Sequence, residues 1–190
     1  MKALTLFKSV FDNKTHKRVD FKDDASFEKL FIDLSALPRK DKKSASLISP
    51  AVYEPDTTRS NASVICWAGW CAVDVDEHIF DGDLEKELLD NYGQWNHIVY
   101  STASSTKEHP KFRIVFPLSE DVPKDKIKHF WFALNKELGD IGDPQTKDLS
   151  RMYYIPGQYA GAYNFIFKNF SGMIMNPYDI MAKHDYVQRA

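Results

Sequence analysis

Hydrophobic positions recur at the three- and four-residue spacing of an amphipathic helix in three segments, the first near residues 25–35. Each predicted helix is bounded by residues that begin or end helices: Pro38 after the first, Asp81 or Asp83 and Gly93 around the second, and Pro123 and Gly139 around the third. Their apolar faces consist of Phe27, Leu30, Phe31 and Leu34; Leu84, Leu88, Leu89 and Tyr92; and Ile127, Phe130, Trp131, Leu134 and Leu138.

Apolar runs between these helices predict strands, and the polar, proline-containing stretch 44–62 is expected to be a loop. Gly69 suggests a turn or bulge within one long run, and the last residues suggest a hairpin or a helix. The expected strands are residues 3–10, 64–76, 95–102, 111–118 and 151–155. This order predicts an α+β fold with a central antiparallel sheet packed by helices and an N-terminal α/β elaboration.

Composition narrows the class of protein. A chain of 190 residues with 43% hydrophobic and 14% aromatic residues can fill one domain core, and no apolar run is long enough to span a membrane. With 25 basic against 27 acidic residues, bulk charge alone cannot bind nucleic acid, although a local basic groove can. Two cysteines suggest reduced thiols and a cytoplasmic protein that has no membrane partner.

Two carboxylates close the segment AVDVDE. Strand alternation places Asp74 and Asp76 on the face opposite Val73 and Val75. Such a pair of hard oxygen ligands suits Mg²⁺ or Mn²⁺; the alternative is a solvated strand edge.

The segment KFRIVFPL carries cations on one strand face. Arg113 lies among bulky apolar residues, where a charge needs an anionic partner, either a core carboxylate or a phosphate. The preceding hydroxyl-rich turn offers Ser104 and Ser105 to phosphate oxygens, unless these serines only form the turn. Further on, Asp143 precedes a turn and Arg151 begins a strand. The alternative role for Arg151 is a surface ion pair with Asp148.

In this order the three segments resemble the catalytic core of the archaeo-eukaryotic primase superfamily, the primase-polymerases, in the branch of phage and plasmid replication proteins. The resemblance covers roughly residues 64–157. It is carried by an apolar strand ending in D-x-D (72–76), by Y-[ST]-T-x-S running into [KR]-[FYW]-R-h-h-h-P-L (100–118), and by an acidic residue before S-R-h-h-h-x-P-G (143 and 150–157).

The resemblance implies one catalytic domain over residues 1–190: an elaboration (1–63), a core (64–157) whose sheet resembles the RNA-recognition-motif topology, and an extension (158–190). It also implies metal-dependent, template-directed nucleotidyl transfer in DNA replication, with nucleoside triphosphates, a single-stranded DNA template and a replicative helicase as partners. The catalytic metal ligands for Mg²⁺ or Mn²⁺ would be Asp74, Asp76 and Asp143, and the triphosphate would be held by Ser104, Ser105, Arg113 and Arg151.

The chain departs from the family pattern at Ser105, where many members carry a histidine; nearby His109 is a further candidate for that space. It also lacks a P-loop, so a helicase engine is expected elsewhere. One alternative is an inactive nucleic-acid-binding module on a primase scaffold. A rolling-circle initiator is disfavoured because no two histidines are two residues apart, and a zinc site is disfavoured because Cys66 and Cys71 fall on opposite strand faces.

Overall fold

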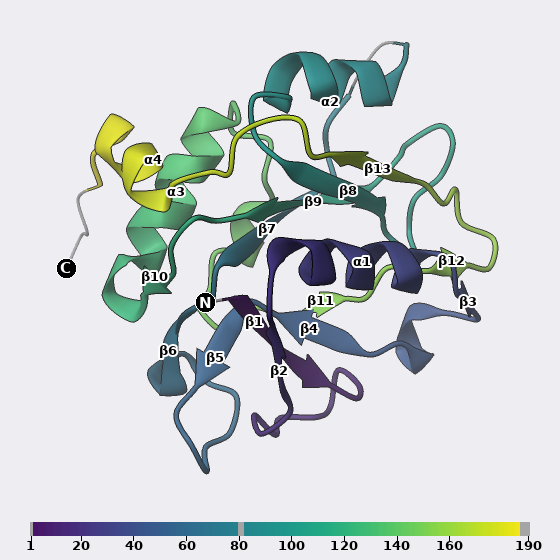
Figure 1. Cartoon of the computed structure of the whole chain (residues 1–190). Coiled ribbons are helices and arrows are strands. Elements are labelled where there is room, and N and C mark those ends of the chain that lie inside the picture. Colours follow the sequence, from purple (N-terminus) through teal and green to yellow (C-terminus); the bar gives the residue numbers. More distant parts are fainter. Residues whose placement is uncertain (1, 80–81, 187–190) are drawn as a thin grey trace.

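Two four-stranded antiparallel sheets organise the computed structural model, which describes residues 2–79 and 82–186 (Figure 1). The core sheet has the order β13-β8-β9-β7 and consists of β7 (Trp70–Val75), β8 (His97–Ser101), β9 (Phe112–Pro117) and β13 (Ile166–Asn169). The N-terminal sheet has the order β11-β4-β1-β2 and consists of β1 (Lys2–Phe7), β2 (Arg18–Phe21), β4 (Leu47–Ser49) and β11 (Tyr153–Tyr154).

Two smaller sheets and the helices complete the chain. The small sheets comprise β5 (Ala51–Tyr53), β6 (Val64–Trp67) and β10 (Val122–Pro123), and the parallel pair β3 (Pro38–Arg39) and β12 (Gln158–Tyr159). The α-helices are α1 (Asp24–Ser35), α2 (Leu84–Tyr92), α3 (Ile127–Glu137) and α4 (Pro177–Lys183), and short 3-10 helices span Lys42–Ser44, Asn61–Ser63, Lys124–Lys126 and Pro144–Thr146. No helix of the described residues is long and apolar enough to cross a bilayer.

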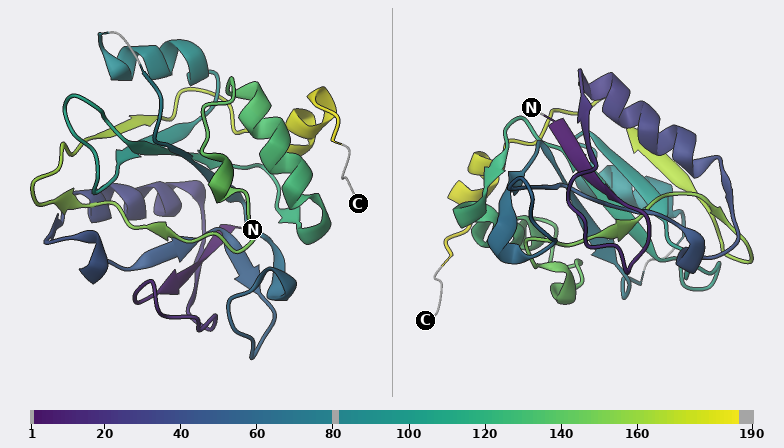
Figure 2. Two further views of the ribbon diagram at one scale, coloured as in Figure 1. Left: turned by 180° about the vertical axis from the view of Figure 1, so that it is seen from behind. Right: turned by 90° about the horizontal axis from the view of Figure 1, so that it is seen from below.

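The two faces of the core sheet are covered differently. Val73, Ile114 and Phe116 contribute to a core shared with α2, α3 and α4, and α3 and α4 lie side by side (Figure 2). The opposite face packs against α1, through Phe27 and Phe31, and against the N-terminal sheet. The segments that carry the three sequence motifs therefore lie where the core sheet and the N-terminal sheet meet.

The predicted α+β class is confirmed, as are the three predicted helices and the paired strands β8 and β9. Asp83 is the N-cap of α2, whereas Asp81 lies outside the described residues. Gly69, at φ 76°, forms the predicted turn and separates β6 from β7, which belong to different sheets. The chain follows the order β7-α2-β8-β9-α3 and then crosses to the N-terminal sheet as β11 before returning as β13.

The prediction of a loop over residues 44–62 is wrong in part. The stretch contains β4 and β5, each three residues long and fully buried. Strands of this length have too few residues for a period-two pattern, and their pairing with β1 and β6 stabilises them instead.

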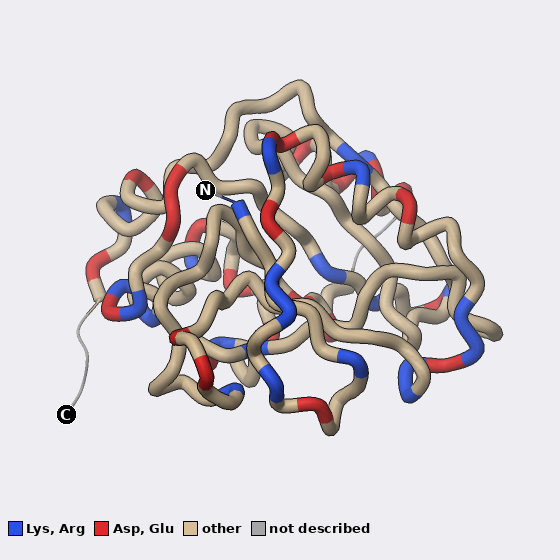
Figure 3. Tube along the Cα trace, turned by 60° about the horizontal axis from the view of Figure 1, so that its bottom comes forward, with Lys and Arg blue, Asp and Glu red and all other residues tan. Residues whose placement is uncertain are grey.

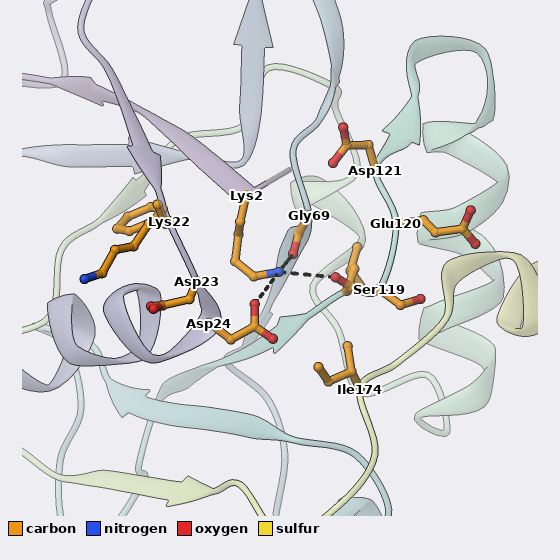
Figure 4. Close-up of a pocket in the computed structure, with 11 residues that line it drawn as sticks. Lys2, Lys22, Asp23, Asp24, Gly69, Ser119, Glu120, Asp121 and Ile174 are labelled. Atoms are coloured by element: carbon orange, nitrogen blue, oxygen red, sulfur yellow. Dashed lines mark hydrogen bonds and ion pairs between the residues drawn. The ribbon is translucent and has the colours of Figure 1, made fainter.

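Lys2 of β1 contacts three other elements at one end of the molecule. Its side chain is 8% exposed, and its Nζ donates to the carbonyl oxygens of Gly69 (2.6 Å) and Leu118 (3.2 Å) (Figure 4). The same ammonium group forms an ion pair with Asp24 of α1 (3.3 Å). This one cation therefore connects β1, the ends of β7 and β9, and the first turn of α1.

We expect Lys2→Met to remove the ammonium donor from these two carbonyl groups and from the carboxylate of Asp24, which costs about 1–3 kcal/mol and lowers the melting temperature by about 3–10 °C. Lys22→Met is the matched control, because Lys22 lines the same pocket but is exposed. Differential scanning calorimetry measures both, and equal melting temperatures for the two variants would contradict the structural role of Lys2.

Candidate active site

A charged row crosses the core sheet on the face toward the N-terminal sheet. Asp74 of β7 lies opposite Arg113 of β9, which lies opposite Tyr100 of β8. Nε of Arg113 is 2.5 Å from Oδ1 of Asp74, and each of these two side chains is 10% exposed. The two residues form a buried ion pair, so of the two possible partners for Arg113 the core carboxylate is present.

Aromatic rings and a carbonyl group fix the guanidinium group of Arg113. It lies 5.7 Å from the ring centre of Tyr100 and 5.5 Å from that of Tyr153. Nη1 donates to the carbonyl oxygen of Tyr154 (3.2 Å). Burial alone would lower the pKa of Arg113, but the charge of Asp74 and the tyrosine hydroxyl groups outweigh burial and raise it. Arg113 therefore stays charged and is held on several sides by protein atoms.

Tyr100 reinforces the same arrangement. Burial raises its pKa to about 12, so its hydroxyl group stays protonated and donates to the carbonyl oxygen of Tyr154 (3.0 Å). Tyr154 thus accepts hydrogen bonds from two side chains of the core sheet while it pairs with β4 of the N-terminal sheet. The carbonyl group of Tyr154 joins the two sheets at the charged row.

The turn before the 3-10 helix Pro144–Thr146 brings Asp143 to Asp74. The amide of Asp143 donates to the carbonyl oxygen of Asp74 (2.9 Å), and one carboxylate oxygen of Asp143 accepts from the amide of Gln145 (3.0 Å). Gly142 permits this approach, because a Cβ atom there would lie 2.8 Å from Cγ1 of Val73 and 2.7 Å from the side chain of Asn135. The absence of a side chain at residue 142 thus lets two acidic residues 69 positions apart lie side by side.

All three predicted carboxylates line one cavity of about 210 Å³. Asp76, directly after β7, is half-buried, and its pKa is raised first by burial and then by the negative charges of Asp74 and Asp143, although Lys111 and Arg113 act in the opposite direction. The carboxylates are therefore close enough to repel one another, which is the situation that a cation relieves.

Cations and hydroxyl groups form the rest of the cavity wall. The predicted Ser104 and Arg151 line it, and Arg151 also lies 3.8 Å from Asp148, a weak ion pair. Lys42 and Lys111 line it as well and were not among the residues expected to hold the triphosphate. The sequence held a signal for Lys111, because strand alternation places it on the face of Arg113.

The structure does not bring Ser105 into this cavity. Its side chain is 1% exposed, and its hydroxyl oxygen accepts a hydrogen bond from the amide of Lys111 (3.2 Å). Ser105 thus closes the turn between β8 and β9. His109 lines a separate cavity of about 530 Å³ together with Glu77 and Lys107, so it does not take the place of a motif histidine.

A neighbouring cavity, of about 350 Å³, shares Asp76 and Asp143 with the 210 Å³ cavity and adds Glu77 and Asp140. The 210 Å³ cavity is therefore rich in cations and the 350 Å³ cavity in carboxylates, and the two meet at Asp76 and Asp143. Within residues 2–79 and 82–186, no three acidic, histidine or cysteine groups surround one point as ligands of an ion. The donor chemistry fits a hard divalent cation, whereas the side chains are not arranged around one.

Comparison with known proteins places the sequence of this chain in a family. No curated protein matches the chain. Among solved structures, the AEP domain of the primase-polymerase of cyanophage S-2L is similar, at 14% sequence identity and a TM-score of 0.49, over 95% of this chain and 86% of that one. The sequence model of the VapE N-terminal domain matches residues 56–188, more than half of the chain. The chain therefore belongs to the VapE N-terminal domain family.

Proposed function

We propose that this chain is a primase-polymerase catalytic domain that transfers nucleotides, directed by a template, in a metal-dependent reaction. The observation that carries the proposal is the meeting of Asp74, Asp76 and Asp143 in one cavity with Lys42, Lys111 and Arg151. A metal-bound triphosphate requires both kinds of group: carboxylates that bind the metal, and cations nearby that bind the phosphates.

Divalent cations, Mg²⁺ or Mn²⁺, fit the donor set. We assign Asp76, Asp143 and the second carboxylate oxygen of Asp74 as their ligands, since Arg113 already contacts Oδ1 of Asp74. Bound ions of this kind neutralise the triphosphate and activate the attacking hydroxyl group. The cavity itself carries four cations against three carboxylates, too small an excess to neutralise a triphosphate without metal.

The triphosphate is assigned to Lys42, Lys111, Arg151 and the hydroxyl group of Ser104. Lys42 comes from the N-terminal elaboration, Lys111 from the start of β9, and Arg151 from the segment before β11, so the phosphates would contact three parts of the chain. Each of these cations is at least partly exposed, which leaves its charge available to a ligand.

Arg113 has a different role in this proposal. Because its guanidinium group already contacts Asp74 and the carbonyl oxygen of Tyr154, we assign it to positioning Asp74. It would hold one carboxylate oxygen in place so that the other remains directed at the cation. We assign residues 1–190 to one catalytic unit, because Lys42 precedes the core and β13 of the extension completes the core sheet.

The remaining partners follow from the reaction. A single-stranded DNA template directs the choice of nucleotide, and the strands must be separated by a helicase, for which this sequence has no P-loop.

The test is extension of a labelled primer on a DNA template with Mn²⁺ or Mg²⁺ and nucleoside triphosphates. We expect Asp76→Asn to lower the rate by about 100- to 1,000-fold, because loss of a metal ligand removes several kcal/mol of transition-state stabilisation. Asp140→Asn is the matched control: Asp140 lines the neighbouring cavity but is not an assigned ligand, and its φ of 61° suits asparagine.

Extension that survives Asp76→Asn would contradict the metal assignment. A wild-type chain that binds oligonucleotides but never extends a primer, with either metal, would instead support the inactive binding module.

A second prediction separates the roles of the two arginines. Arg113→Lys keeps the charge but loses the planar group between two tyrosine rings, so we expect kcat to fall about 10- to 100-fold with little change in the KM for the nucleotide. Arg151→Ala should raise that KM. Thermal unfolding verifies that both variants are folded, and a raised nucleotide KM with unchanged kcat in Arg113→Lys would contradict its positioning role.

A further inference from the structure

The loop between β1 and β2 presents a phenylalanine to solvent. Phe11 is 93% exposed and its neighbour Val10 is 45% exposed, whereas the flanking strand residue Phe7 is fully buried. An aromatic ring that contacts almost no protein atoms contributes nothing to the core. The face of the Phe11 ring is therefore available to a ligand.

This loop is tightly held. Both carboxylate oxygens of Asp12 accept backbone hydrogen bonds, from the amides of Lys8 (2.9 Å) and Lys14 (3.0 Å). These two amides lower the pKa of Asp12, so the carboxylate stays ionised and keeps both bonds. Arg59 donates its amide to the carbonyl oxygen of Asn13 (2.8 Å), which fastens the loop to the segment after β5. The exposed ring is thus presented on a pre-formed support, which spares a ligand the cost of ordering it.

The charge of the loop is basic. Residues 8–17 contain Lys8, Lys14 and Lys17 against the single carboxylate of Asp12, which the backbone occupies. Figure 3 shows Lys and Arg on both arms of the loop, with one acidic stretch at its turn. An exposed ring between exposed cations is complementary to a base between two phosphates.

We infer that this loop binds single-stranded nucleic acid, with a base stacked on Phe11 and phosphates contacting Lys8 and Lys14. The inference rests on the proposed function, because a template-directed enzyme must hold an unpaired strand. A duplex is a poorer fit, since its bases are stacked on each other and unavailable to the ring. A membrane is a poorer fit because two exposed apolar side chains offer little area for insertion.

The loop is close to the candidate active site. Phe7, where it begins, lies opposite Leu47 of β4, and Leu47 lies opposite Tyr154 of β11, which lines the cavity. With neighbouring strands about 4.8 Å apart, the loop begins about 10 Å from Tyr154. Arg59, which holds the loop, also donates from Nη1 to the carbonyl oxygen of Ser150 (3.2 Å), and Ser150 is adjacent to Arg151. A strand bound here would need to span only a few nucleotides to reach the cavity.

The test is fluorescence anisotropy of the full chain with a fluorescein-labelled oligothymidylate of about 20 nucleotides. We expect Phe11→Ala to weaken binding about 5- to 100-fold and Phe11→Trp to keep it, because any aromatic ring can stack on a base. Met173→Ala is the matched control, since Met173 is 66% exposed and lies outside this loop. Lys8→Ala and Lys14→Ala should each reduce the salt dependence of binding by about 0.7 in logarithmic slope.

Wild-type affinity for the oligothymidylate in Phe11→Ala would overturn the inference. The same measurement with a labelled DNA duplex and with anionic vesicles gives two further tests. The inference would also be overturned if Phe11→Ala weakened duplex binding equally, or weakened only the binding of vesicles. Primer extension separates this result from the proposed function. If Phe11→Ala binds like the wild type while Asp76→Asn abolishes extension, only the inference fails. If the wild type does not extend but Phe11→Ala still loses the oligonucleotide, only the proposed function fails.

Discussion

The buried ion pair between Asp74 and Arg113 is the constraint on which the site depends. Removing two charges from water is costly, and the mutual attraction of such a pair repays little more than that cost, so it adds little to stability. It does fix the register of β7 against β9. A slip of one residue would turn Asp74 into the apolar core between the sheet and α3 and leave Arg113 buried without a partner.

The same pair explains why the N-terminal sheet belongs to the site. Arg113 needs more contacts than one carboxylate supplies, and they come from the ring of Tyr153 and the carbonyl oxygen of Tyr154, both in β11. Because β11 pairs with β4, the N-terminal sheet is held against the charged row, and the segment that follows α1 brings Lys42 to the cavity. Residues 1–63, which lie outside the motifs, thus contribute both the strand β4 that holds β11 and the cation Lys42.

Sequence patterns predicted the elements that stabilise themselves locally. The helix α2 has its cap at Asp83 and its end at Gly93, and β8 and β9 form an adjacent pair with long apolar runs, so each is visible without knowledge of the rest. In contrast, β4 and β5 contain three residues each, and only pairing with other segments of the chain makes them strands. That information lies in the tertiary structure, which is why the loop prediction over residues 44–62 was wrong in part.

The site was predictable in its residue types and less so in its contacts. Motif spacing selected Asp74, Asp76 and Asp143, which line one cavity, yet no spacing rule states that Arg113 pairs with Asp74 or that Ser105 closes a turn. Both facts depend on cross-strand register, which the hydrophobic alternation constrains only to the nearest two residues. Register also decides chemistry here. With Arg113 opposite Asp74, that arginine is committed to the carboxylate, and the at least partly exposed Lys42, Lys111 and Arg151 are left as the cations that a ligand can reach.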